Sequence, residues 1–205
     1  MNYGGSKEDF LNKLLASTKE MERVLNYNGN IFICIGDRQA MPFHYLSKVL
    51  ENTNLKYQGF VVWDYSSGYR TEVDVFDKKL LWFHLTKSNS FYYNSLEIDS
   101  YWQGYWELPT SNIQSILDSE LATGRNKFLE DTYPIEIAHR FIKIFSRPND
   151  IVFDPFGGTG VTALSALENN RLFITNDISW NMSLIAQDRI ELYSSNKERY
   201  RSLND

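Results

Sequence analysis

A glycine-rich segment between two acidic residues carries the clearest chemistry in this sequence. The segment runs Asp154-Pro155-Phe156-Gly157-Gly158-Thr159-Gly160 and separates an apolar run from a helical pattern. Such a turn brings backbone N–H groups and the positive end of a helix close to a bound ligand. Gly158, Gly160 and Ala163 fit the spacing of a dinucleotide loop, and Asp177 follows about 20 residues later, where an acid accepts hydrogen bonds from ribose hydroxyls.

Asp154 argues against a dinucleotide ligand. Its carboxylate lies at the strand end immediately before the loop, where it would repel an anionic pyrophosphate. Only 45 residues follow Gly160, too few for the two halves of a dinucleotide-binding domain. No Gly-Lys-Ser/Thr follows the loop, which excludes a phosphate-binding P-loop. A ligand with an ammonium group and a ribose but no pyrophosphate suits both acids, and S-adenosylmethionine is such a ligand.

A second interpretation of the same residues needs no ligand. In it, Asp154 caps the helix that follows, and the glycines only form a tight turn between strand and helix. The loop chemistry by itself leaves both interpretations open.

Several motifs together resemble those of the amino-group DNA methyltransferases, which methylate N6 of adenine or N4 of cytosine. The loop, extended by Val161-Thr162, resembles the family's cofactor motif. Phe173-Ile174-Thr175-Asn176-Asp177-Ile178-Ser179 resembles the next motif, whose acid holds the cofactor ribose and whose following apolar residue touches the adenine. Thr132-Tyr133-Pro134-Ile135-Glu136-Ile137 resembles the motif beside the methionine end of the cofactor. Residues 20–25 and 28–37 resemble the helix and strand that follow the catalytic motif, and Trp106-Glu107-Leu108-Pro109 resembles a further recurring element.

The resemblance implies a binding site for S-adenosylmethionine. Asp154 would hold the methionine ammonium, residues 156–158 the methionine end, and Asp177 the ribose. The implied cofactor-binding residues are Thr132, Tyr133, Pro134, Asp154, Pro155, Phe156, Gly157, Gly158, Thr159, Gly160, Asp177 and Ile178.

The order of the motifs is similar to that of the permuted subgroup called β, because the cofactor loop lies near the C-terminus. In that subgroup a target-recognition segment lies between the motifs, here about residues 65–126, within a single methyltransferase domain of residues 1–205. DNA is the implied partner, and aromatic residues of this segment could stack on bases, although we expect core packing for most of them. Candidate phosphate contacts are Arg70, Lys78, Lys79, Lys87, Arg125 and Lys127, although for any one of them an ordinary solvated charge is the default interpretation.

The family's catalytic tetrapeptide, Asp, Asn or Ser followed by Pro-Pro and Tyr or Phe, does not occur in this sequence. We therefore assign no catalytic residue and expect a chain that is incomplete at its N-terminus. The implied reaction is methyl transfer to the exocyclic amine of a flipped base. The alternatives are a non-catalytic cofactor-binding subunit that needs a complementary chain or a second copy, and a decayed remnant. A dinucleotide-dependent enzyme is a more distant alternative.

The elements around the loop predict an α/β fold. Strands are predicted at residues 31–35, 60–63, 80–85, 151–153 and 172–175, and helices at 6–25, 42–50, 134–147, 161–167 and 181–193. Ser6 followed by Asp9 resembles a capping box at the start of the first helix. Residues 31–35 and 172–175 have the apolar character of buried strands. The alternation predicts a Rossmann-like methyltransferase fold with a parallel-rich sheet, flanking helices and a strand missing at the N-terminus.

Composition further limits the class of protein, the metal sites and the cellular location that the sequence allows. The 205 residues carry a net charge of −5, which disfavours a sequence-blind nucleic-acid coat protein. The single cysteine, Cys34, fits a reducing cytoplasm and excludes a cysteine-built zinc site. His44, His84 and His139 show no metal-ligand spacing, so no metal is expected. No apolar run is long enough for a membrane span, and we expect a cytoplasmic protein without a membrane partner.

Overall fold

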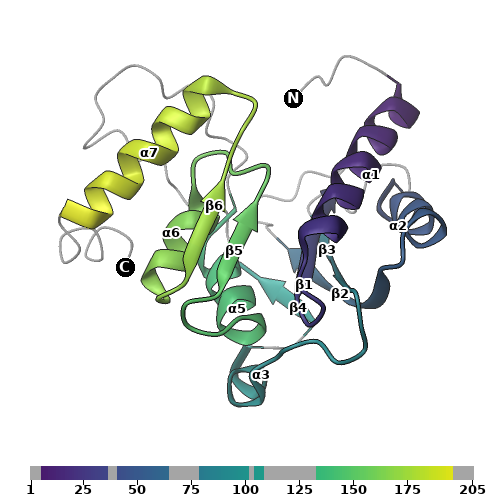
Figure 1. Ribbon diagram of the computed structural model, residues 1–205, viewed down its shortest axis with the longest axis horizontal. Coiled ribbons are helices and arrows are strands. Elements are labelled where there is room, and N and C mark those ends of the chain that lie inside the picture. Colours follow the sequence, from purple (N-terminus) through teal and green to yellow (C-terminus); the bar gives the residue numbers. More distant parts are fainter. Residues whose placement is uncertain (1–5, 37–40, 65–78, 102–103, 109–132, 196–205) are drawn as a thin grey trace, which may run out of the picture. The chain divides into compact units, whose positions relative to one another are not determined.

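The computed structural model describes residues 6–36, 41–64, 79–101, 104–108 and 133–195 (Figure 1). The chain divides into two compact units. The first comprises residues 1–93 and 99–108, and the second comprises residues 94–98 and 109–205. The segment predicted for target recognition is described only in part, and Thr132 lies outside the described residues.

The first unit is built on a four-stranded sheet in the order β1-β3-β2-β4. Its strands are β1 (Asn30–Gly36), β2 (Lys56–Asp64), β3 (Lys79–Thr86) and β4 (Tyr105–Glu107). Its helices are α1 (Lys7–Val24) and α2 (Met41–Asn52), and a short helix, α3 (Ser95–Tyr101), begins in the second unit and ends in the first. β3 runs antiparallel to β1 and β2, whereas β2 and β4 are parallel. This sheet is therefore less parallel than expected, because β3 inserts in the opposite direction between β1 and β2. β3 is an inner strand of the sheet although it belongs to the predicted target-recognition segment.

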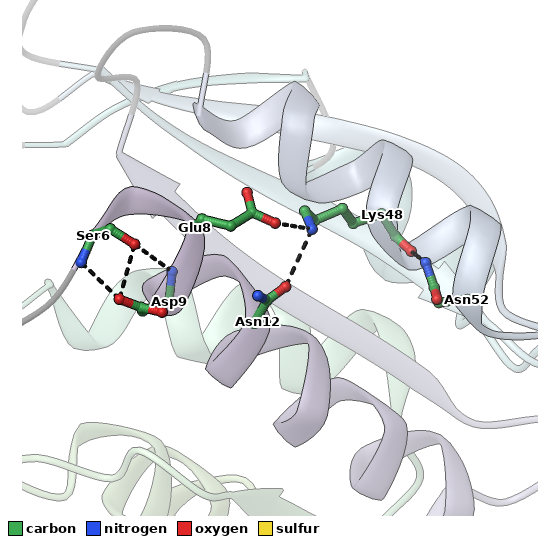
Figure 2. Close-up of polar contacts among 6 residues, drawn as sticks. All are labelled: Ser6, Glu8, Asp9, Asn12, Lys48 and Asn52. Atoms are coloured by element: carbon green, nitrogen blue, oxygen red, sulfur yellow. Dashed lines mark hydrogen bonds and ion pairs between the residues drawn. The ribbon is translucent and has the colours of Figure 1, made fainter.

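Helices α1 and α2 cover one face of this sheet. Ser6 and Asp9 form the predicted capping box at the start of α1, since each side chain accepts a hydrogen bond from the other residue's backbone N–H (Figure 2). The Lys48 ammonium of α2 lies 2.6 Å from Glu8 and 3.2 Å from Asn12, which links the two helices. The core below them contains Leu11, Leu15, Ile31, Ile33, Ile35, Tyr45, Val49, Leu55 and Leu85. Burial alternates along β1, so the predicted strand is covered more fully on this face than on the other.

The second unit contains the predicted series of strands and helices. Its elements are α5 (Ile135–Phe145), β5 (Ile151–Asp154), α6 (Val161–Glu168), β6 (Leu172–Thr175) and α7 (Trp180–Ser195) (Figure 1). β5 and β6 pair in parallel, with Ile151 opposite Leu172 and Asp154 opposite Thr175. Val152 and Phe173 pack against a cluster from α5, α6 and α7, namely Ala138, Ile142, Val161, Ala166 and Ile185.

The prediction of a buried strand at residues 172–175 is wrong for one face. Leu172 and Ile174 are 57% and 54% exposed, and Ile151 and Phe153 beside them on β5 are also exposed. Because side chains alternate along a strand, only one face of this short sheet lies against the helices of its own unit. Among the described helices, none combines the length and apolar character needed to cross a membrane.

Side chains at the junction of α5 and α6 fix the two helices against each other. His139 Nδ1 lies 2.8 Å from Ser165 Oγ and 2.7 Å from Asn169 Nδ2, and its Nε2 lies 2.9 Å from Glu168 Oε2. Ser165 and Asn169 are buried. These contacts use both ring nitrogens of His139, with Nδ1 toward the side chains of Ser165 and Asn169 and Nε2 toward the Glu168 carboxylate.

His84 is buried in β3 of the first unit. Its Nε2 lies 2.8 Å from Asn30 Oδ1, and its ring stacks on Phe32 with 4.6 Å between the ring centroids. Phe91 packs against it edge to face at 5.0 Å. Burial lowers the pKa of His84 to about 4, so the folded protein keeps this ring neutral at physiological pH.

Acid should therefore destabilise the protein through His84. In the unfolded chain His84 binds a proton below about pH 6.5, whereas in the folded chain it does so only near pH 4. The free energy of unfolding is therefore highest above pH 6.5 and falls as the pH drops from 6.5 to about 4. Urea denaturation should show that His84 contributes roughly 2–3 kcal/mol of the loss between pH 7 and pH 4.5. His84→Gln should remove that part of the pH dependence, whereas His44→Gln, on the exposed surface of α2, should retain it. Identical pH profiles for wild type and His84→Gln would contradict this assignment.

Candidate functional site

The Asp154 carboxylate fixes both ends of the glycine loop. Asp154 ends β5, and its Oδ1 accepts a hydrogen bond from the Phe156 N–H at 3.0 Å. Its Oδ2 accepts one from the Thr162 hydroxyl, in the first turn of α6, at 2.5 Å. One side chain thus joins the end of the strand to the first turn of the helix. It does not cap the helix as the second interpretation expected, because the N-cap residue of α6 is Gly160 and the bond from α6 to Asp154 comes from the Thr162 side chain. An ionised carboxylate has about four acceptor positions, so these two bonds leave capacity for a ligand.

The glycines allow a backbone path that other residues would not. Gly158 and Gly160 have φ of 51° and 82°, in the left-handed region. A Cβ on Gly157 would lie 1.8 Å from Thr175 Oγ1, and one on Gly160 would lie 2.9 Å from the Ala186 Cβ. The loop therefore packs directly against the end of β6 and against α7.

Asp177 holds the loop from the neighbouring strand. Its Oδ2 accepts a hydrogen bond from the Gly158 N–H at 3.0 Å, and its Oδ1 accepts one from the Ser179 N–H at 2.8 Å. Asp154 ends β5 and Asp177 follows the end of β6, so both acids lie at the carboxyl edge of a parallel pair. Ligands of open α/β sheets bind at this edge.

The Phe156, Gly157, Gly158 and Gly160 N–H groups of the loop are already in use. The Phe156 and Gly158 N–H groups donate to the two acids, the Gly157 N–H donates to the Asn176 carbonyl at 2.9 Å, and the Gly160 N–H donates to the Gly157 carbonyl at 2.8 Å. A pyrophosphate would need these same donors. The geometry therefore favours a ligand that meets carboxylates rather than amides.

Three large apolar side chains border the acids. Phe156 is 58% exposed, Trp180 is 74% exposed, and Ile178 is fully exposed. Phe156 and Ile178 were predicted site residues, whereas Trp180 opens α7 and was not. Apolar surface beside two carboxylates suits a ligand that combines charged and polar groups with an aromatic ring.

The structure also connects the predicted methionine-end motif to the loop. The Tyr133 hydroxyl lies 2.5 Å from Thr162 Oγ1, which in turn bonds to Asp154, and Pro134 is the buried N-cap residue of α5. Thr162 was not among the predicted site residues, although it stands in the motif quoted for the resemblance. The sequence feature that could have identified Thr162 is a hydroxyl side chain in the first helical turn after a glycine loop.

Two of the six candidate phosphate contacts lie in the described part of the chain. The Lys87 ammonium donates to the Leu25 carbonyl at 2.6 Å. The Lys79 ammonium lies 3.9 Å from Asp64 and 5.6 Å from the centroid of the Tyr105 ring. Lys79 and Lys87 thus both have partners within the protein, which favours structural roles for them. Arg70, Lys78, Arg125 and Lys127 lie outside the described residues, and the described residues contain no cluster of three or more side chains suited to a metal ion.

Solved structures share this architecture. The cytosine-N4-specific PvuII DNA methyltransferase superposes with a TM-score of 0.77 at 15% identity, covering 100% of this chain and 79% of that one. The complex of M1.HpyAVI with S-adenosylmethionine superposes with a TM-score of 0.68 at 21% identity, covering 92% of this chain and 86% of that one. These likenesses confirm the predicted fold class.

Sequence comparison gives the family. M.BamHII, an orphan methyltransferase of Bacillus amyloliquefaciens, is 36% identical over 88 residues, which are 43% of this chain and 31% of that protein. The chain spans less than half the length of the curated relatives that it matches. A family model described as DNA methylase, for N6 and N4 methyltransferases, matches residues 2–188. Because that model covers nearly the whole chain, this protein belongs to the N6/N4 DNA methylase family.

Proposed function

We propose that the second unit binds S-adenosylmethionine at the glycine loop and that the reaction it serves methylates the exocyclic amine of adenine or cytosine in DNA. The observation that carries the proposal is the pair of carboxylates, Asp154 and Asp177, which accept the Phe156 and Gly158 N–H groups of the glycine loop. S-Adenosylmethionine offers an ammonium for one acid and ribose hydroxyls for the other, without a pyrophosphate.

The remaining contacts follow from the shape of the site. Asp154 would receive the methionine ammonium, and Asp177 would receive the ribose through the acceptor positions that the Gly158 and Ser179 amides leave. Ile178 and Trp180 are exposed beside Asp177, where the adenine ring would cover them. Burial of their apolar surface would add to the affinity.

The chemistry needs positioning more than acid–base groups. A methyl group bound to a sulfonium is already activated, so an amine held in line with the sulfur–methyl bond would take the methyl directly. The sulfur–carbon bond would break as the nitrogen–carbon bond forms, a neutral thioether would leave, and the methylated amine would lose its proton to water. The base must leave the DNA stack to reach this geometry. We therefore assign cofactor binding to this unit and no proton-transfer role to its residues.

Asp177→Ala should weaken the binding of S-adenosylmethionine by about 1–3 kcal/mol, through the loss of charge-assisted hydrogen bonds to the ribose. Isothermal titration calorimetry on the purified chain measures this directly. Asp150→Ala is the matched control, because Asp150 lies at the opposite end of β5, where its carboxylate accepts a hydrogen bond from the Arg147 N–H at 2.8 Å. An unchanged dissociation constant in a folded Asp177→Ala protein would remove Asp177 from the site.

The same calorimetry separates the proposal from a dinucleotide function. Wild type should bind S-adenosylmethionine more tightly than NAD, since Asp154 faces the position that a pyrophosphate would take. Tighter binding of NAD than of S-adenosylmethionine would contradict the cofactor assignment.

A second candidate function is that of a cofactor-binding subunit completed by another polypeptide. The observation that favours it is that no two prolines are adjacent in these 205 residues, so the family's catalytic tetrapeptide is not among them. That tetrapeptide would hold the amine and stack on the flipped base.

The 205-residue chain by itself should accordingly show little or no methylation of DNA. The measurement is transfer of tritium from labelled S-adenosylmethionine to mixed-sequence DNA, with and without an added peptide that carries a Pro-Pro-Tyr tetrapeptide and its flanking strand. A peptide of the same composition in scrambled order is the control. Robust labelling by the chain without the peptide would show that other residues perform the catalytic role.

A further inference from the structure

Arg189 of α7 is a charged side chain buried beneath the glycine loop. Its exposed fraction is 5%, as is that of Thr159 in the loop. Its Nη1 donates to the Thr159 carbonyl at 2.7 Å and contacts the Thr159 hydroxyl at 3.1 Å. A guanidinium is costly to remove from water unless its donors meet well-placed acceptors. Thr159 supplies two such acceptors.

The bond to Arg189 fixes a peptide that would otherwise rotate easily. Thr159 lies between two glycines with positive φ, and glycine imposes little steric restriction on its neighbours' peptide planes. The carbonyl of the Thr159–Gly160 peptide accepts from Arg189, while its N–H donates to the Gly157 carbonyl at 2.8 Å. Both ends of this peptide are therefore held, and its orientation is set.

The segment from Asp177 to α7 contacts three successive residues of the loop. Asp177 accepts the Gly158 N–H, Arg189 donates to Thr159, and Ala186 packs where Gly160 has no side chain. Ala186 and Arg189 are three residues apart, so they share one face of the helix. Without the contact from Arg189 to Thr159, the segment would hold the loop only at Gly158 and Gly160.

We propose that Arg189 is a positioning residue for the cofactor. It acts through the Thr159 peptide, which it orients so that Gly158 stays bonded to Asp177 and both acids keep their ligand-binding geometry. This rests on the proposed binding of S-adenosylmethionine at the loop.

Two measurements on three variants test the proposal. Arg189→Met keeps the length of the side chain without its donors, and Arg189→Lys restores one positive donor. Arg171→Met is the matched control, because the Arg171 guanidinium donates to the carbonyls of Ser146 and Asn169 in the same unit but at the start of β6, away from the loop. The readouts are the dissociation constant for S-adenosylmethionine and the exchange rates of the Gly158 and Gly160 amides, with circular dichroism to verify folding.

We expect Arg189→Met to weaken cofactor binding about tenfold, in the range of one lost hydrogen bond to a charged group, and to speed exchange at both amides. Arg189→Lys should recover part of both losses, and Arg171→Met should leave both unchanged even if its melting temperature falls. Wild-type affinity and exchange in folded Arg189→Met, or equal losses in Arg171→Met, would overturn the proposal. If Arg189→Met does not fold, Arg189→Gln, which removes the charge and shortens the side chain, takes its place, and wild-type affinity and exchange in that folded variant would overturn the proposal.

The test also distinguishes this proposal from the one on which it rests. If wild type fails to bind S-adenosylmethionine, the proposed function fails and the role of Arg189 toward a cofactor fails with it. In that case faster amide exchange in Arg189→Met would show only that the arginine orders the loop. If wild type binds and Arg189→Met binds equally well, only the positioning role is rejected.

Discussion

The hydrogen bond between the Gly158 N–H and the Asp177 carboxylate joins the ends of two short parallel strands, and much of the second unit's site depends on it. β5 and β6 pair over only four residues each, so backbone pairing alone gives their carboxyl ends little rigidity. The loop that follows β5 crosses to the residue that follows β6, and this bond holds the crossing. With it in place, the Asp154 carboxylate at the end of β5 faces the same edge as Asp177.

The two acids place like charges next to a helix start. The partial positive charge at the N-terminus of α6 and the backbone N–H groups offset part of this cost. The remaining negative potential favours a cation and disfavours a phosphate, and it exists before any ligand arrives. A site prepared in this way avoids the reorganisation that would otherwise reduce binding affinity.

The sequence predicted the glycine loop and its neighbouring elements because local rules decide them. Ser6 with Asp9 marked the start of α1, and the glycines marked the end of β5 and the start of α6. What it did not predict depends on tertiary contact. Leu172 and Ile174 were predicted to be buried but are exposed, because the apolar character of a strand does not indicate how many of its faces are covered. Arg189 was missed because a helical arginine is ordinarily solvated, and only the fold shows that it lies under Thr159.

The same distinction applies to β3. Residues 80–85 were predicted as a strand from their composition, and β3 extends from Lys79 to Thr86. Its position between β1 and β2 requires strand pairing over long sequence separation, which no local pattern encodes. The burial of His84 follows from that position, since β1 supplies the Phe32 ring that stacks on it.

The close approach of Gly157 to Thr175 has a consequence for how this protein can vary. The two residues belong to separate motifs, yet the Thr175 hydroxyl occupies the space that a side chain at position 157 would need. Neither position is free to change alone toward larger residues, so substitutions accepted at one depend on the residue at the other. In a library that randomises both positions, functional sequences should show inversely correlated side-chain volumes at this pair, because the strand and the loop share the same space there.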